Sequence, residues 1–235
     1  MKFNKYLIKL LIFFIALTQG INFSYCKLKN IQEKIIYLTF DDGPDKIVTS
    51  NILDTLKDKN AKATFFLIGK LVELEPNITK RIYEDGHSIG LHSFSHDRNT
   101  VYKNNLSFLN EMLKTQEIIF NITNQKVHIL RFPFGTNNIS YNIDKTMVDL
   151  LHDNNFKIYD WDIDSGDGLY PNSNPYKIFE KCKNTKDTPV ILLHCGAINI
   201  NTSKALPFIL DFFETEGFTF KGIDENTKEI YNIKN

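Results

Sequence analysis

Residues 35–44 read Ile-Ile-Tyr-Leu-Thr-Phe-Asp-Asp-Gly-Pro, an apolar run that ends in a polar turn. The first six residues are β-branched, aromatic or aliphatic, which is typical of a buried strand. The four that follow are residues that turns prefer, because Asp and Gly tolerate turn conformations and Pro fixes its own backbone. We therefore expect a strand over residues 35–40 whose C-terminal end carries Asp41 and Asp42.

Beyond this stretch, strand-like and helix-like segments alternate to the end of the chain. Further strands are predicted at residues 63–68, 88–92, 127–132, 156–161, 189–193 and 218–220. Helices are predicted at residues 47–59, 76–84, 105–120, 142–152, 174–182 and 204–216, and the apolar stripe of the longest is formed by Leu106, Leu109, Leu113 and Phe120. Such alternation indicates an α/β fold with parallel strands and right-handed crossovers. We expect a distorted seven-stranded β/α barrel, with an open doubly wound sheet as the alternative.

The composition is that of one ordinary folded domain. The chain has 235 residues, 42% hydrophobic and 24% charged, so it can bury one sizeable core and is neither disordered nor a multi-span membrane protein. Its 28 basic and 28 acidic residues leave no net charge, and there is no basic stripe, so we expect no nucleic-acid partner. We expect a monomer. Cys182 and Cys195 are expected to be free buried thiols, with a disulfide as the alternative.

The N-terminus has the pattern of an export signal. Lys2, Lys5 and Lys9 precede an apolar run over residues 10–17, and small or polar residues follow. Eight uninterrupted apolar residues are too few for a transmembrane helix, which needs about 20. We therefore expect residues 1–26 to be a signal peptide or an N-terminal anchor, and residues 27–235 to be one secreted or cell-surface domain. Membrane contact is expected only through the N-terminal segment.

Unusual polar residues gather at the predicted C-terminal ends of the strands. Five strands each close with, or are followed by, one such group: Asp41 and Asp42; His92 and His96; Arg131; Asp162, Asp164 and Asp167; and His194. In β/α barrels this end of the strands carries the active site. The sequence therefore predicts that these side chains meet at one rim.

The first two groups have the donors of a catalytic metal site. The spacing of His92 and His96 predicts two imidazoles on one face of a helical turn. Two histidines and one carboxylate make three protein ligands and leave a position for water. Burying both Asp41 and Asp42 without a cation is costly, so we expect one to bind the ion and the other to act as base toward its water.

The motifs around these residues resemble those of one enzyme family. Residues 39–44 (Thr-Phe-Asp-Asp-Gly-Pro), 92–96 (His-Ser-Phe-Ser-His), 131–135 (Arg-Phe-Pro-Phe-Gly), 164–167 (Asp-Ser-Gly-Asp) and 192–194 (Leu-Leu-His) are similar, in order, to motifs of the NodB-like polysaccharide deacetylases, carbohydrate esterase family 4. The resemblance implies a distorted seven-stranded β/α barrel. It also implies a metal-dependent hydrolase that removes N-acetyl groups from a cell-wall or chitin-like polysaccharide. The N-acetylglucosamine of peptidoglycan is the expected substrate.

The resemblance assigns roles to the first three motifs. Asp42, His92 and His96 would hold the metal, and Asp41 would be the general base, oriented by Arg131. The expected metal is Zn²⁺, with Co²⁺, Ni²⁺ and Fe²⁺ as alternatives, since sites of this kind accept several divalent ions.

The remaining motifs would supply the acid and the substrate pocket. His194 would be the general acid, and Asp167 would orient it and favour its protonated form. The backbone N–H of Phe134 would stabilise the oxyanion. Leu192 or Leu193 would line the pocket for the acetyl methyl group.

One position departs from the family pattern. The fourth motif of the family usually ends in Asp-Trp, and the Trp forms one wall of the sugar groove. Here Asp167 is followed by Gly168, and the only Trp of the chain is Trp161. Trp161, Leu169 or Tyr170 would have to supply a substitute wall, which leaves substrate preference open.

Three other functions remain as alternatives. An O-acetyl esterase acting on xylan-like polymers would use the same chemistry on a different bond. A catalytically idle barrel that only binds glycan would explain the altered groove wall. A metal phosphoesterase would also need a divalent ion, but the sequence has no glycine-rich phosphate cradle to favour it.

Overall fold

The computed structural model describes residues 33–138, 141–183 and 188–233. From Ile35 onward these residues belong to one folded unit. The predicted export segment, residues 1–26, lies outside the described residues.

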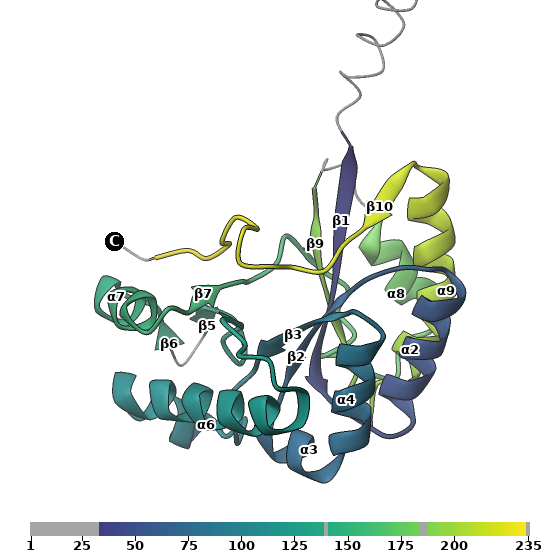
Figure 1. The fold of residues 1–235 in the computed structure, drawn as a ribbon. Coiled ribbons are helices and arrows are strands. Elements are labelled where there is room, and N and C mark those ends of the chain that lie inside the picture. The colour runs from purple at the N-terminus through teal and green to yellow at the C-terminus, as the bar shows by residue number, and fades with distance from the viewer. Residues whose placement is uncertain (1–32, 139–140, 184–187, 234–235) are drawn as a thin grey trace, which may run out of the picture. The chain divides into compact units, whose positions relative to one another are not determined.

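A curled, largely parallel sheet forms the centre of this unit (Figure 1). Its strands are β1 (Lys34–Gly43), β2 (Thr64–Leu67), β3 (Ser88–Leu91), β4 (Ile129–Leu130), β7 (Lys157–Ile158), β8 (Ile163–Asp164), β9 (Val190–His194) and β10 (Phe218–Phe220). Neighbours follow the order β7-β4-β3-β2-β1-β9-β8, and β10 also pairs with β1. The six pairs along this order are all parallel.

The strand order distinguishes the barrel from the doubly wound alternative. The chain builds outward from β1 to β7, then starts again at the opposite edge with β8 and returns to β1 with β9. A doubly wound sheet would place β8 beside β1 and add β9 outside it. The observed order is that of a ring of seven strands opened between β7 and β8. The predicted distorted barrel is confirmed.

A short connection spans the opening in the ring. Residues 159–162 are the whole connection between β7 and β8. Five Cα-to-Cα steps therefore separate the two edges, which lie within about 18 Å of each other. We refer to this gap as the seam. The sequence suggested a single strand over residues 156–161. The structure instead divides this region into β7 and a separate β8, which carries Asp164.

The six predicted helices are all present. They are α2 (Val48–Asp58), α4 (Pro76–Glu84), α6 (Asn105–Thr123), α7 (Lys145–Asp153), α8 (Pro175–Cys182) and α9 (Ile200–Thr215). Sequence reasoning missed two short helices, α3 (Gly69–Leu74) and α5 (Arg98–Val101), and a hairpin of β5 (Asn137–Asn138) and β6 (Tyr141–Asn142). The helix expected from residue 142 begins only at Lys145, because the Asp144 side chain accepts from the Met147 N–H and caps it there.

The helices cover the sheet in two groups. α8 packs against α9 and α9 against α2, while α3 and α4 pack against α6 (Figure 1). The buried face of α6 differs from the predicted stripe. Leu106, Leu113 and Phe120 are exposed by 64%, 37% and 43%. The helix instead buries a set that recurs every three or four residues and includes Phe108, Leu109, Met112, Thr115 and Ile119.

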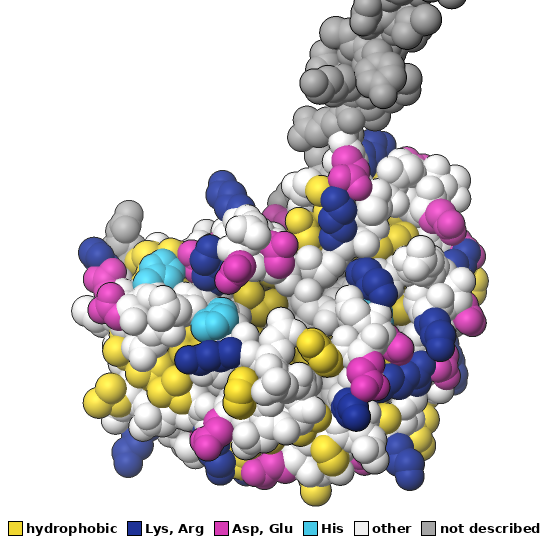
Figure 2. All heavy atoms as spheres, in the orientation of Figure 1, with side chains coloured by type: hydrophobic (Ala, Val, Ile, Leu, Met, Phe, Trp, Pro, Cys, Tyr) yellow, Lys and Arg dark blue, Asp and Glu magenta, His cyan; other side chains and the backbone are white. Residues whose placement is uncertain are grey.

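The cysteines and the surface charges are as the sequence predicts. Cys182 and Cys195 are free and buried, as expected. On the face seen in Figure 2, Lys and Arg side chains are interspersed with Asp and Glu rather than gathered in a basic patch. Among the helices of the described residues, none has the length and apolar character needed to cross a membrane.

We predict that the N-cap of α6 contributes measurably to stability. The Asn104 side chain accepts from the Ser107 N–H at 2.8 Å, which satisfies one of the free donors at the helix start. Asn104→Ala should lower the free energy of unfolding by about 1 kcal/mol in urea titrations. Asn110→Ala, at an exposed position within the same helix, should be neutral or slightly stabilising. Equal losses in both variants would contradict this account of the cap.

Candidate active site

Two neighbouring strands bring residues far apart in sequence to one place. β1 pairs with β9 so that Asp41 lies opposite His194 and Thr39 opposite Leu192. Side chains alternate between the faces of a strand, so these four share one face of the sheet. The same alternation would send Asp42 to the other face. However, the register of β1 with β2 shifts between Asp41 and Gly43, and this irregularity lets both aspartates face His92.

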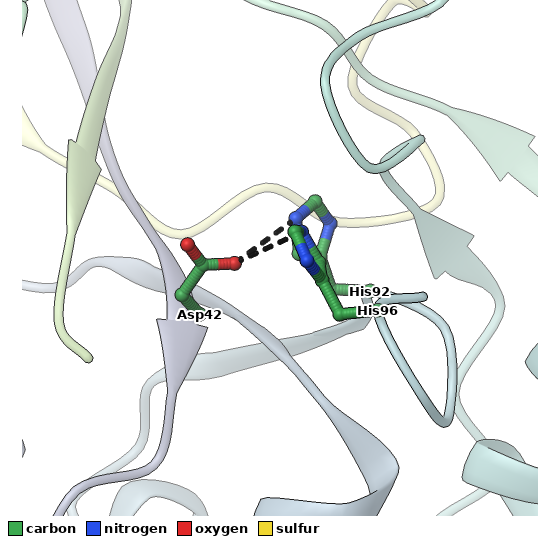
Figure 3. A group of neighbouring side chains, drawn as sticks. All are labelled: Asp42, His92 and His96. Atoms are coloured by element: carbon green, nitrogen blue, oxygen red, sulfur yellow. Dashed lines mark ion pairs between the residues drawn. The ribbon is translucent and has the colours of Figure 1, made fainter. Parts of the chain in front are cut away.

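Asp42, His92 and His96 form a compact cluster (Figure 3). Oδ1 of Asp42 lies 3.5 Å from Nε2 of His92 and 3.3 Å from Nε2 of His96. The ligand atoms of all three residues lie within 4.8 Å of one another. The sequence-predicted metal ligands are therefore brought together, from β1 and from the segment that follows β3.

The cluster fits a divalent cation. Asp42 Oδ1 is buried, and within the described part of the chain it has no hydrogen-bond partner. His92 Nδ1 lies 3.0 Å from the Arg131 carbonyl oxygen, which fixes the proton there and leaves the Nε2 lone pair toward the cluster. Burial, with the charges of His96 and Arg131, lowers the pKa of His92 well below its usual range, so the ring is neutral as a ligand must be. A buried carboxylate oxygen facing two imidazole nitrogens is a donor set that a cation would complete.

The predicted helical turn between the two histidines is wrong. Residues 92–97 form an irregular loop, in which Ser93 and His96 have φ values of 63° and 51°. Asp42 and Phe134 also have positive φ, at 65° and 68°. Residues other than glycine rarely adopt this region and do so at a cost in energy, so the surrounding contacts must hold them there. Four such residues meet at this one site.

Asp41 is held by the buried guanidinium of Arg131. Its Oδ1 accepts from Arg131 Nη1 at 2.8 Å, while its Oδ2 lies 3.7 Å from His92 Nε2. Burial raises the pKa of Asp41 to about 6, against the opposing charges of Arg131 and His194. Arg131 is itself fully buried, and it also donates to the Thr39 hydroxyl. The arrangement leaves one oxygen of Asp41 directed at the cluster.

A second buried pair joins His194, at the end of β9, to Asp167, in the segment that follows β8. Asp167 accepts from the His194 N–H at 2.8 Å and lies 2.7 Å from its Nδ1. Burial alone would lower the pKa of His194, but the hydrogen bond and charge of Asp167 raise it to about 9. Thr202 and Ser165 donate their hydroxyls to the same carboxylate. Sequence reasoning missed both, because a Thr on a helix or a Ser in a loop carries no signal of its own.

Of the four predicted substrate-binding residues, three lie near the site and one lies in the hydrophobic core. Phe134 is 41% exposed and its ring centroid lies 4.8 Å from that of His96, so it borders the cluster. Leu192 shares a face with His194, whereas Leu193 is fully buried in the hydrophobic core. Trp161 is half-buried beside Arg131, at 5.5 Å from the guanidinium carbon. Leu192, not Leu193, is therefore the leucine placed toward the site.

Comparison with known families decides the identity. Residues 29–158 match the family model described as polysaccharide deacetylase. The chain belongs to this family. The matched segment contains Asp41, His92 and Arg131. The deacetylase is 36% identical over 203 residues to a peptidoglycan-N-acetylglucosamine deacetylase of Bacillus cereus, which covers 83% of this chain and 71% of that protein.

Solved structures agree with this membership. A crystal structure of a polysaccharide deacetylase from Bacillus cereus superimposes with a TM-score of 0.77 at 35% identity, over 85% of this chain and 97% of that chain. The catalytic domain of a peptidoglycan N-acetylglucosamine deacetylase from Eubacterium rectale gives 0.77 at 28% identity, over 88% and 96%. The protein is therefore a hydrolase of carbohydrate esterase family 4, a family of deacetylases that depend on a divalent metal.

The deacetylase differs from the family pattern where His194 meets Gly168. A Cβ built on Gly168 would lie 2.6 Å from Nε2 and 2.9 Å from Nδ1 of His194. The imidazole therefore occupies the space that a side chain at 168 would need. Leu169 and Tyr170, the next residues, are exposed by 76% and 58%. The absence of a side chain at Gly168 thus leaves room for the ring of His194.

We predict that the buried Arg131 is required for stability as well as for the site. Arg131→Met would leave the Asp41 carboxylate buried without its cation, and it should lower the free energy of unfolding by about 3–5 kcal/mol. Arg81→Met removes partly exposed pairs with Asp54 and Asp85, and it should cost at most about 1 kcal/mol for each pair. Urea titrations of the metal-free chain measure both. Similar losses in the two variants would contradict the role given to burial.

Proposed function

We propose that this deacetylase removes the N-acetyl group from N-acetylglucosamine in peptidoglycan. The observation that carries the proposal is the pairing of Asp41 with His194 on adjacent strands, beside the cluster of Asp42, His92 and His96. Hydrolysis of an amide needs a base for the attacking water and a separate acid for the departing amine. The substrate named for the Bacillus cereus relative supports the choice of peptidoglycan.

We infer that Asp42, His92 and His96 hold a divalent cation, with Zn²⁺ as the expected ion and Co²⁺, Ni²⁺ or Fe²⁺ as alternatives. When bound, such an ion polarises the acetyl carbonyl and lowers the pKa of a water molecule. Two histidines and one carboxylate leave a coordination position for that water.

Asp41 acts as the general base in this proposal. Arg131 occupies Oδ1, so Oδ2 is the oxygen that faces the cluster and takes the proton of the attacking water. Arg131 also fixes the orientation of this carboxylate, because three further donated hydrogen bonds hold the guanidinium itself in place. The base is therefore held rigidly before the substrate arrives.

His194 acts as the general acid. Asp167 holds Nδ1, so the Nε2 proton is the one delivered to the departing amine. The backbone N–H of Phe134 donates to the developing oxyanion. Leu192, on the same face as His194, lines the pocket for the acetyl methyl group, while Phe134 and Trp161 border the sugar.

The pH dependence of activity tests the acid. Asp167 raises the pKa of His194 to about 9, so the imidazole keeps its proton at neutral pH and loses it as pH rises through that value. Asp167→Asn removes the raising charge, so kcat/KM should begin to fall at a pH lower by about one unit. Matched profiles of kcat/KM for wild type and variant measure the shift. An unchanged alkaline limb would remove His194 from the role of acid.

The reaction itself is tested by release of acetate. We expect residues 27–235 to release acetate from peptidoglycan and from N-acetylglucosamine oligomers, and to lose this activity in chelator or as Asp41→Asn. Zinc should restore the chelated enzyme but not the variant. Muropeptide analysis by mass spectrometry identifies which amino sugar has lost its acetyl group.

Other outcomes of this experiment decide the alternatives. Release from acetylated xylan alone would assign the protein as an O-acetyl esterase with the same residues in the same roles. No release by folded, zinc-loaded protein would favour a glycan-binding barrel. The filled catalytic positions count against that reading, because a binding module has no use for a base and an acid beside one metal site.

We further propose that the enzyme works outside the cytoplasmic membrane. The pattern of Lys2, Lys5 and Lys9 before the apolar residues 10–17 supports export, with residues 1–26 as a cleaved signal or retained anchor. Residues 27–235 then form the deacetylase domain, acting as a monomer on the cell wall.

A further inference from the structure

Glu111, in the middle of α6, holds the loop that carries His96. A single carboxylate oxygen, Oε2, accepts three hydrogen bonds from this loop. The donors are the Phe94 N–H at 3.0 Å, the Ser95 N–H at 2.7 Å and the Ser95 hydroxyl at 2.8 Å. Bonds to an ionised acceptor are roughly twice as strong as neutral ones. No catalytic step proposed above uses Glu111.

The loop needs such a support. Ser93 and His96 lie in the left-handed region, on either side of the two residues that Glu111 binds. Each such residue costs of the order of 1 kcal/mol or more, so a free loop would relax to ordinary backbone angles. The local bond from the His96 N–H to the Ser93 hydroxyl stays within the loop and does not anchor it to the barrel.

The same helix also fixes the loop through Phe94. Lys114, one turn beyond Glu111 on α6, places its Nζ 3.3 Å from the centroid of the Phe94 ring. A Cβ at Gly69 would lie 2.6 Å from a carbon of that ring, so the ring also rests on bare backbone. The N–H groups of Gly69 and Lys70 donate to the carbonyl oxygens of Ser93 and Phe94. α6 and the start of α3 thus both hold the loop.

The three metal ligands differ in how they are held. Asp42 lies within β1, and His92 directly follows β3 and is tied to the Arg131 carbonyl. His96 lies four residues further along, in the loop that Glu111 supports. Loss of Glu111 would therefore leave two ligands in place and loosen the third.

We propose that Glu111 is a positioning residue that sets the affinity of the metal site by fixing His96 against Asp42. The proposal rests on the metal site of the proposed function, and it concerns affinity for the ion rather than turnover. Residues that orient metal ligands typically change affinity by about 10-fold to 100-fold when they are lost.

The test is Zn²⁺ affinity, measured by competition with a chelating dye. Glu111→Ala should bind Zn²⁺ about 10-fold to 100-fold more weakly than wild type. Glu111→Gln keeps an amide oxygen for the same donors and should recover most of the affinity. Glu117→Ala, at an exposed position on the same helix, should bind as wild type does. Urea titration in chelator checks that each variant is folded.

A double-mutant cycle separates positioning from a general loss of stability. In a His96→Ala background the ligand is already gone, so adding Glu111→Ala should have little further effect on Zn²⁺ affinity. Additive losses, or a folded Glu111→Ala with wild-type affinity, would overturn the proposal.

Two further results keep the test decisive. If Glu111→Ala does not fold, Ser95→Ala is the substitute, because it removes one of the three donors to Glu111. It should weaken Zn²⁺ binding by about threefold or more. Unchanged affinity in Ser95→Ala would overturn the proposal. A wild-type chain that binds Zn²⁺ but releases no acetate refutes the proposed function and leaves the role of Glu111 standing. A wild-type chain that binds no divalent metal overturns both.

Discussion

The buried guanidinium of Arg131 is the interaction on which the rest of the molecule depends. It donates to Asp41 and Thr39 on β1, and to the carbonyl oxygens of Tyr159 and Asp160. Those two carbonyls belong to the connection that crosses the seam between β7 and β8, where the sheet stops. A guanidinium loses hydration free energy on burial, and here a charged and three polar acceptors take the place of the water. One side chain therefore ties the seam of the barrel to the strand that carries both aspartates.

The charges around Arg131 explain why a metal belongs at this site. Arg131 compensates Asp41, and protonated His194 compensates Asp167. Asp42 faces the imidazoles of His92 and His96, and burial lowers the pKa of His92. Arg131 and His194 thus each pair with another carboxylate, and neither pairs with Asp42. A divalent ion at the cluster would supply the missing positive charge and the electrophile together.

The sequence was most informative where chemistry and strand ends coincide. Asp41, His92, Arg131 and His194 were assigned to one rim because hydrophobic runs end directly before them, and parallel strands end at the same edge. The backbone between them was harder to predict. Nothing local to residues 92–96 reveals that Glu111 accepts their N–H groups, so a helical turn was the natural interpretation. The buried face of α6 was predicted incorrectly because apolar residues lie on more than one side of that helix. Only packing against the rest of the fold decides which side is buried. β8 has two residues, too few for any pattern.

Gly168 also limits how this deacetylase can change over evolutionary time. The ring of His194 fills the space that a larger residue at 168 would need. A substitution at 168 by any larger residue would displace that ring, so this position cannot gain a side chain unless β9 and the segment after β8 shift together. The exposed neighbours Leu169 and Tyr170 carry no such restriction, and they are the positions at which this part of the surface can vary freely.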